Sequence, residues 1–273
     1  MSLLEVEDLT VTIGAKAVVD HVSFAVDHSE RLGIIGESGS GKTLSVLSII
    51  GLTPDVAKVS GSIRFDGVEL LGMRDRRLAK LRGEQIAAVF QDPLTSLNPL
   101  MRVGRQISET LRLHQSIGRE QAASAAIDLA ERVGLPDPRS AVRAYPHQLS
   151  GGQRQRVGIA IAIAAKPRLL IADEPTTALD VTVQAEIIAL LDELIADEGT
   201  ALLFITHDIA LVSQVARSLI VMRHGQIVEH GDVSELIAAP RHPYTAELVA
   251  AARATSTDAS AATRATSTDA SAT

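Results

Sequence analysis

The sequence predicts an α/β fold in which helices cover a mainly parallel sheet, with antiparallel strands at the N-terminus and a helical insertion. Three observations lead to this expectation. Short runs rich in Val, Leu and Ile, separated by polar turns, occupy residues 3–26, as in antiparallel strands. Later in the chain, apolar strand-like runs alternate with helical runs, which is typical of parallel sheets. Residues 102–146, by contrast, are mostly polar and helix-like and are broken by Gly and Pro.

Composition limits the possible classes of function. The chain has 273 residues, 46% of them hydrophobic, enough for one or two domains with a full core. It has no Cys, which excludes disulfides, zinc–thiolate sites and iron–sulfur clusters. The net charge of −7 argues against a general nucleic-acid binder. The N-terminus is charged where a signal peptide would be apolar, and the longest apolar run, Val157–Ala165, is shorter than the roughly 20 residues that cross a bilayer. Any association with a membrane therefore depends on a partner.

The individual elements follow from their own residues. A turn at Gly14–Lys16 divides the N-terminal strands, and a second strand pair surrounds Gly61–Gly67. The apolar run Leu32–Ile35 predicts a buried strand, and the charged residues 75–82 predict an amphipathic helix. The other expected elements, in chain order, are a helix over 44–50, a strand over 86–90, a helix over 152–165, a strand over 168–172, a helix over 181–197, strands over 200–206, 218–222 and 226–229, and two short helices.

The run from Gly36 to Thr43 fits the pattern G-x-x-x-x-G-K-[ST], and its surroundings are those of a phosphate-binding loop. A buried strand leads in and a helix leads out, so that phosphates would lie at a helix N-terminus. The glycines let backbone N–H groups point at a phosphate, Lys42 would reach the β- and γ-phosphates, and the Thr43 hydroxyl would bind Mg²⁺. Taken alone, the motif indicates a P-loop NTPase and no more. The residues assigned to the nucleotide are Gly36, Glu37, Ser38, Gly39, Ser40, Gly41, Lys42 and Thr43, with Lys42 also counted as catalytic.

Two adjacent carboxylates, Asp173 and Glu174, follow the buried strand over 168–172. Because side chains alternate along an extended segment, the two cannot point the same way. This division suits Asp173 as a Mg²⁺ ligand acting through water, and Glu174 as the base for a water that attacks the γ-phosphate. Considered by itself, the pair is better explained as two solvated acids at a strand end, since exposed acid pairs are common.

A second anion site is predicted where Leu149 and Ser150 lead into the helix over 152–165. Ser150 is a good N-cap, and the glycines after it expose N–H groups at the positive end of the helix. Since the P-loop already accommodates one set of phosphates, the economical explanation is a nucleotide held by another protomer. A flexible turn with a helix cap is the alternative. The residues assigned to this second site are Ser150, Gly151, Gly152 and Gln153.

Taken together, these segments resemble those of ABC-transporter ATPases. The P-loop, Gln91, the L-S-G-G-Q signature, the D-E strand end, Ala178–Asp180 and His207 occur in that family's order, over about residues 3–250. The resemblance implies a P-loop NTPase (RecA-like) core with an N-terminal antiparallel β subdomain and an inserted α-helical subdomain. It implies a single ATPase domain over 1–252, with the helical subdomain at about 92–155.

The resemblance also implies a head-to-tail dimer with ATP at its interface. Each ATP would lie between Lys42 and Thr43 of one subunit and Ser150 and Gly152 of the other. Asp180 would cross the interface and couple the two sites.

Two more residues receive roles from the resemblance. Gln91 would contact Mg²⁺ and the attacking water, and would report the γ-phosphate to the helical region. His207 would hydrogen-bond the γ-phosphate and position it against Glu174, although a lone His is more often a satisfied surface or core residue.

Ile13 departs from the family's pattern. An aromatic residue usually stacks on adenine from this region, and no aromatic residue precedes Phe24 in this chain. Loss of ring stacking, about 1–3 kcal/mol by analogy with base–aromatic contacts, predicts weaker adenine binding. Ser29, where the family usually has Gly, is a lesser deviation.

Four stretches are similar to the oligopeptide/dipeptide/nickel importer subfamily, and most of all to its D-type ATPase: residues 91–99, 145–147, 173–184 and 242–245. This likeness implies a second ATPase subunit, either a copy of this chain or a distinct F-type chain, together with two transmembrane permeases. A solute-binding protein would act indirectly, and no nucleic acid is involved. The chain would be peripheral on the cytoplasmic face of the cell (inner) membrane.

Peptide import is the favoured activity, and import of nickel or another small solute is the alternative. Many peptide-type members carry cysteines for an iron–sulfur cluster after the 242–245 segment, and this chain has none. A soluble, non-transport ABC ATPase is less favoured, since such proteins usually carry two ATPase units, long coiled coils or zinc sites. Residues 253–273 repeat one short unit and have no apolar residue larger than Ala, so we expect a disordered tail.

Overall fold

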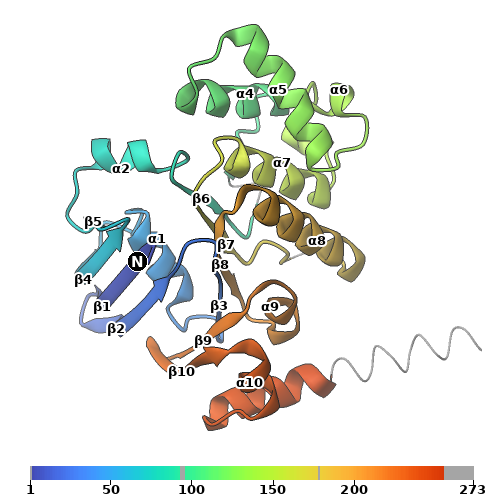
Figure 1. Cartoon of the computed structure of the whole chain (residues 1–273). Coiled ribbons are helices and arrows are strands. Elements are labelled where there is room, and N and C mark those ends of the chain that lie inside the picture. Colours follow the sequence, from blue (N-terminus) through green and yellow to red (C-terminus); the bar gives the residue numbers. More distant parts are fainter. Residues whose placement is uncertain (1, 93–95, 178, 255–273) are drawn as a thin grey trace, which may run out of the picture.

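The computed structural model describes residues 2–92, 96–177 and 179–254. Two sheets lie side by side, and a group of helices forms the end of the molecule furthest from α10 (Figure 1). Ala178 and most of the predicted tail, 255–273, lie outside the described residues. Residues 253 and 254 continue the helix that begins at Pro243.

The N-terminal sheet is antiparallel throughout and has the strand order β2-β1-β4-β5. Along β1, buried Leu4 and Val6 alternate with more exposed residues, which is the pattern of a sheet with one face on a core. The predicted N-terminal antiparallel region is confirmed. Its strands are β1 (Leu4–Ile13), β2 (Lys16–Val26), β4 (Ala57–Phe65) and β5 (Val68–Glu69).

The second sheet has the order β10-β9-β3-β8-β7-β6, and only the edge strand β10 is antiparallel to its neighbour. The expected mainly parallel sheet is therefore present. Its strands are β3 (Arg31–Ile35), β6 (Ile86–Val89), β7 (Leu169–Asp173), β8 (Ala201–Thr206), β9 (Ser218–Arg223) and β10 (Gln226–Asp232).

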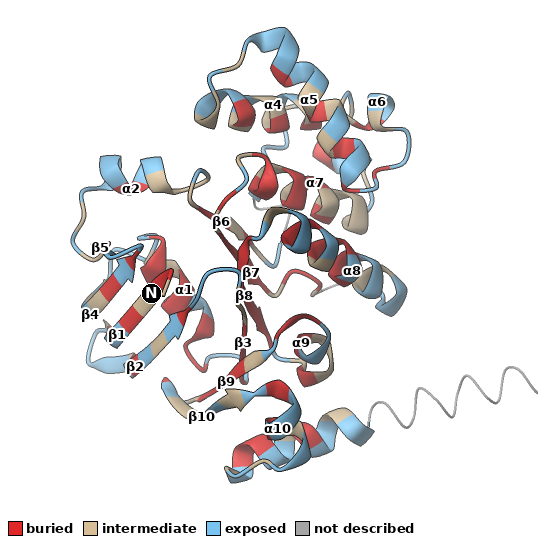
Figure 2. Cartoon of the chain, in the orientation of Figure 1, coloured by how far each residue is buried: buried red, intermediate tan, exposed pale blue. Residues whose placement is uncertain are grey.

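The parallel sheet separates two hydrophobic cores, and its central strands are buried on both faces (Figure 2). In β8, Leu202 and Phe204 join the core under the helices, while Leu203 and Ile205 join the core shared with the antiparallel sheet. Since successive side chains point to opposite faces, both sets must be apolar. This double burial explains the unbroken apolar runs in the sequence.

Helix packing explains why the polar middle of the chain folds. Every fourth residue of α5, including Ala122 and Ala126, is a buried alanine, and α4 buries Val103, Ile107 and Leu111 at the same spacing. The helices are α1 (Lys42–Ile49), α2 (Asp75–Leu81), α4 (Val103–His114), α5 (Arg119–Arg132), α6 (Pro138–Ala141), the 3₁₀ turn η1 (Pro146–Gln148), α7 (Gly151–Ile163), α8 (Val181–Glu198), α9 (Ile209–Val215) and α10 (Val233–Ala238).

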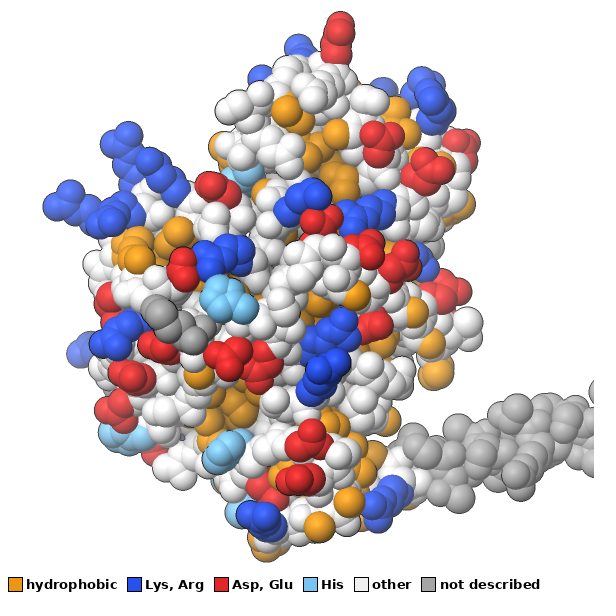
Figure 3. Space-filling model, in the orientation of Figure 1, with side chains coloured by type: hydrophobic (Ala, Val, Ile, Leu, Met, Phe, Trp, Pro, Cys, Tyr) orange, Lys and Arg blue, Asp and Glu red, His pale blue; other side chains and the backbone are white. Residues whose placement is uncertain are grey.

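The molecular surface carries charges of both signs. On the face drawn in Figure 3, Lys and Arg side chains are interspersed with Asp and Glu, and the basic group at upper left lies over α2 with its exposed Arg76, Arg77 and Lys80. Among the described helices, none combines the length and the apolar character that a bilayer crossing needs.

Candidate functional site

Several of the predicted site residues gather because parallel strands end at one edge of the sheet. Ile35 of β3 is paired with Thr206 of β8, Asp173 of β7 with Ile205, and Val89 of β6 with Ala172. The four neighbouring strands therefore end at nearly the same level of the sheet. Gly36, Gln91, Glu174 and His207 follow these strand ends within a residue or two, at the edge where open α/β sheets bind ligands.

The P-loop needs glycine at positions where the backbone is left-handed and crowded. Gly41 has φ +99°, and a Cβ there would lie 2.7 Å from the carbonyl oxygen of Val18. Gly41 is also the N-cap of α1 and has no side chain to cap it. The first N–H groups of α1 are therefore not bonded to a capping side chain, and they point toward the loop.

Lys42 is almost fully buried and folds back over the loop that it ends. Its Nζ donates to the carbonyl oxygens of Gly36, at 2.6 Å, and Glu37, at 2.9 Å. Burial lowers the pKa of Lys42, and the carboxylates of Glu174, Asp173 and Glu37 oppose that shift. The ammonium is thus already at the centre of the loop, held by carbonyl groups that a phosphate would replace.

Asp173 is buried at the end of β7 and has spare capacity to accept bonds. Burial raises the pKa of Asp173, while its hydrogen bond with Thr43 and the charge of Lys42 lower it. Within the described residues, the Oδ1 atom of Asp173 and the hydroxyl of Ser40 are buried without a hydrogen-bond partner. Carboxylate and hydroxyl oxygens are the ligands that Mg²⁺ prefers, so Asp173 and the hydroxyl of its hydrogen-bond partner Thr43 fit the ion that the sequence predicts.

Glu174 has different surroundings from Asp173, as the sequence predicts. Its φ of +47° turns the backbone sharply, and its N–H donates to Ile205 O at 2.9 Å. The Oε2 atom of Glu174 accepts a hydrogen bond from Thr177 Oγ1 at 2.9 Å and lies 3.3 Å from Nδ1 of His207. The exposed His207 ring and the largely buried Glu174 carboxylate therefore form a pair that opens toward solvent.

Gln91 lies at the edge of the sheet that carries the P-loop, whereas the L-S-G-G-Q segment lies at the start of α7. Gln91 is exposed just beyond the end of β6. Ser150 caps α7, and the capping box has Gln153 N donating to Ser150 Oγ at 3.2 Å and Ser150 N donating to Gln153 Oε1 at 2.9 Å. The predicted N-cap is confirmed.

The glycines of this segment lie against the start of α8. A Cβ on Gly152 would be 2.7 Å from Val183, and one on Gly151 would be 3.5 Å from Leu179. Asp180 caps α8 by accepting from Val183 N at 3.0 Å. Ser150 itself is exposed, and Asp180 has a capping role that the sequence prediction did not include.

Besides the bonds of Lys42 to its own loop, two further contacts at the site were not predicted. Thr177 donates to the Glu174 carboxylate, and the Tyr244 hydroxyl accepts from the Glu37 N–H at 2.8 Å. Thr177 follows the D-E strand end by three residues, so its proximity could have been inferred. The pairing of residues 37 and 244 had no signal in the sequence, because it joins positions 207 residues apart.

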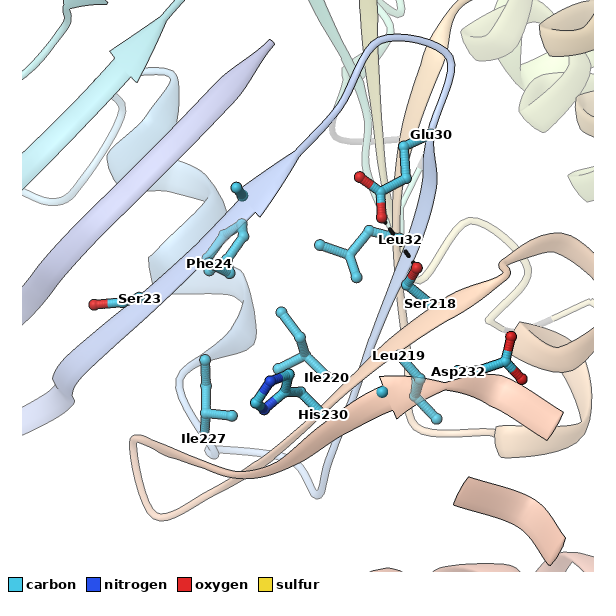
Figure 4. Close-up of a pocket in the computed structure, with 12 residues that line it drawn as sticks. Ser23, Phe24, Glu30, Leu32, Ser218, Leu219, Ile220, Ile227, His230 and Asp232 are labelled. Atoms are coloured by element: carbon cyan, nitrogen blue, oxygen red, sulfur yellow. Dashed lines mark hydrogen bonds between the residues drawn. The ribbon is translucent and has the colours of Figure 1, made fainter. Parts of the chain in front are cut away.

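A separate cavity of about 500 Å³ lies between β2, β3 and the β9–β10 pair (Figure 4). Phe24, Leu32, Ile220 and Ile227 line it together with His230. None of the residues assigned to the nucleotide lines this cavity. It lies near the beginning of β3 and β9, at the opposite end of these strands from the P-loop.

Ile13 is the last residue of β1, beside the β1–β2 turn, and 37% of its surface is exposed. We expect Ile13→Tyr to tighten ATP binding about fivefold or more, because a ring there would restore base stacking of about 1–3 kcal/mol. Fluorescence titration with ATP would measure the change, with Val56→Tyr as the matched control on another exposed apolar residue. Equal affinity in wild type and Ile13→Tyr would show that adenine binds elsewhere.

In comparisons with known proteins, the family model, the related sequences and the solved structures all point to ATP-binding proteins of the ABC type. The family described as ABC transporter matches residues 19–177. Over 256 residues, the chain is 50% identical to the dipeptide transport ATP-binding protein DppD of Escherichia coli, covering 92% of this chain and 78% of DppD. It is 47% identical to the oligopeptide transport ATP-binding protein OppD of Bacillus subtilis, covering 91% and 71% of the two chains. Among solved structures, the dimeric ATP-binding cassette MJ0796 bound to ADP and Pi superposes with a TM-score of 0.75 at 27% identity, covering 84% of this chain and 98% of that one.

Proposed function

Because this chain belongs to the ABC transporter family, we propose that it is the ATP-hydrolysing subunit of an importer for dipeptides or oligopeptides. The observation that carries the ATPase assignment is the convergence of Lys42, Asp173, Glu174 and His207 at one sheet edge. The solute class rests on the peptide transporters to which the chain is 47–50% identical. These relatives favour peptides over the nickel alternative.

The P-loop binds the nucleotide in this proposal. When phosphates enter, Lys42 leaves the carbonyls of Gly36 and Glu37 and donates to phosphate oxygens instead, while the N–H groups of α1 point at the same oxygens. Thr43, Asp173 and Gln91 would hold Mg²⁺, which supplies charge neutralisation on the phosphates.

Hydrolysis depends on Glu174 and His207. Water attacks the γ-phosphorus, the bond from that phosphorus to the β–γ bridging oxygen breaks, and Glu174 accepts the proton that the water loses. His207, already 3.3 Å from the Glu174 carboxylate, donates to the γ-phosphate and holds it against the base. The Thr177 hydroxyl fixes the direction of the same carboxylate.

A second subunit completes the site. Ser150 is exposed, and α7 presents the N–H groups of Gly151 and Gly152 beside it. They would bind the γ-phosphate of an ATP held by the P-loop of a partner ATPase. The similarity to a dimeric ATP-binding cassette supports this arrangement. The partner is a second copy or a distinct F-type chain.

Transport requires further components. Two permeases would span the membrane, with this chain peripheral on the cytoplasmic face, and a solute-binding protein would deliver peptides to them. The helices α4 to α6 stand apart from the sheets (Figure 1) and, with Gln91 at the site edge, would connect ATP binding to the permeases.

Reconstitution of the assembled transporter in vesicles tests this function. With the binding protein present, dipeptides are expected to raise ATP hydrolysis several-fold and to accumulate inside, because transport and turnover are coupled. The measurements are phosphate release and uptake of a labelled dipeptide. Stimulation by Ni²⁺ but not by any peptide would contradict the solute class, and co-purification with ribosomes or DNA instead of permeases would contradict import.

A further inference from the structure

The segment from Arg241 to the end of the described helix contacts the P-loop directly. The Tyr244 hydroxyl accepts a hydrogen bond from the backbone N–H of Glu37 at 2.8 Å. Tyr244 is 1% exposed and is among the largest fully buried side chains. Burial raises the pKa of Tyr244, so its hydroxyl stays protonated while it accepts from the amide.

Tyr244 is held in place through both its ring and its backbone. The Arg223 guanidinium lies over it, 4.6 Å from the ring centre. The Tyr244 N–H donates to Nδ1 of His242, and the Glu229 carboxylate accepts from the N–H groups of Arg241 and His242. The hydroxyl is therefore presented to the loop by a fixed scaffold.

The same strand end supports the beginning of the P-loop. A Cβ on Gly36 would lie 2.2 Å from the carbonyl oxygen of Met222, the residue before Arg223. The end of β9 thus packs against Gly36 directly, and it fixes Glu37 through Arg223 and Tyr244. The peptide units at the loop entrance are held between these groups and Lys42.

Nucleotide binding removes one of these restraints. Lys42 Nζ holds the carbonyl oxygens of Gly36 and Glu37, and it must leave them to reach a phosphate. The bond from the Glu37 N–H to Tyr244 does not involve the ammonium, so it can persist in the bound state. It then limits the freedom of a loop whose residues 37–39 are exposed.

We propose that Tyr244 is a positioning residue for the nucleotide: its hydroxyl holds the P-loop entrance through the Glu37 amide and makes the 241–254 segment part of the ATP site. This inference rests on the proposed nucleotide site. It adds a residue that lies on a different element from the phosphate-binding groups and that touches the loop instead of the substrate.

Tyr244→Phe in the full chain tests the proposal, because it removes only the hydroxyl and keeps the ring on Arg223. We expect the Kd for ATP and for ADP to rise about fivefold, the equivalent of about 1 kcal/mol. Thr200→Val is the matched control, since the buried Thr200 hydroxyl also makes one hydrogen bond, to Pro167 O at 2.8 Å, before the start of β8. It should lower Tm about as much as Tyr244→Phe and leave both Kd values unchanged.

The outcomes separate three cases. A raised Kd in Tyr244→Phe together with an unchanged Kd in Thr200→Val supports the proposal. Wild-type affinity in Tyr244→Phe, or an equal loss in both variants, overturns it, because the hydroxyl would then contribute only general stability. Lys42→Ala, measured alongside, tests the nucleotide site on which the proposal rests. If Lys42→Ala also binds ATP like wild type, the nucleotide site itself is wrong. If Lys42→Ala loses affinity while Tyr244→Phe does not, only the role of Tyr244 is rejected.

Discussion

Replacement of Glu174 with Gln is expected to abolish steady-state ATP hydrolysis while ATP stays bound. Glutamine keeps the size of the side chain and can still accept from the Thr177 hydroxyl, but it cannot take a proton from water. General-base catalysis contributes about 10²- to 10⁴-fold, so phosphate release should fall by at least two orders of magnitude. Nucleotide titration should give a Kd close to wild type, because the groups of the P-loop are unchanged.

The same variant should accumulate as a dimer with its partner ATPase when ATP and Mg²⁺ are present. In the proposed mechanism, hydrolysis separates the subunits, so without it the ATP would stay between the P-loop and Ser150 of the other chain. Light scattering after size exclusion would detect this species. Glu193→Gln makes the same chemical change on an exposed residue of α8 and should hydrolyse ATP normally. Turnover near the wild-type rate in Glu174→Gln would refute the assignment of the base.

Lys42→Ala is expected to lose most of its affinity for ATP. Hydrogen bonds to charged groups contribute about 1.5–3 kcal/mol each, which corresponds to a loss of between about tenfold and 150-fold. The substitution also leaves the carbonyl oxygens of Gly36 and Glu37 without their ammonium partner, and the nearby carboxylates lose a compensating charge. Calorimetric titration with ATP measures the affinity directly.

Lys80→Ala provides the control for this experiment. It removes the same side chain from the exposed face of α2, so the net charge changes equally while the P-loop stays intact. Its ATP affinity should match wild type. Undiminished binding in Lys42→Ala would mean that the phosphates do not lie in the loop.

Local sequence was sufficient to predict most of the elements and the groups at their ends. The β1–β2 pair, the buried strand before the P-loop and the Ser150 cap each depend on residues that are neighbours in the chain. The glycines of the P-loop predicted a backbone able to turn its N–H groups inward, and Gly41 has the left-handed φ of +99°. Helix caps, turns and strand alternation arise from short-range sterics and hydrogen bonds, so they can be read directly.

The tertiary structure alone decided which of these groups meet. The distance from Glu174 to His207 depends on the pairing of Asp173 with Ile205 in neighbouring strands, and strand order cannot be deduced from periodicity. Lys42 bonds to carbonyls of its own loop, and Tyr244 reaches Glu37 across 207 residues. Such contacts depend on how the two sheets and the C-terminal helix pack, and packing is a property of the whole chain. The sequence by itself thus determined the chemical groups and their local geometry, while the packing of distant segments brought them into one site.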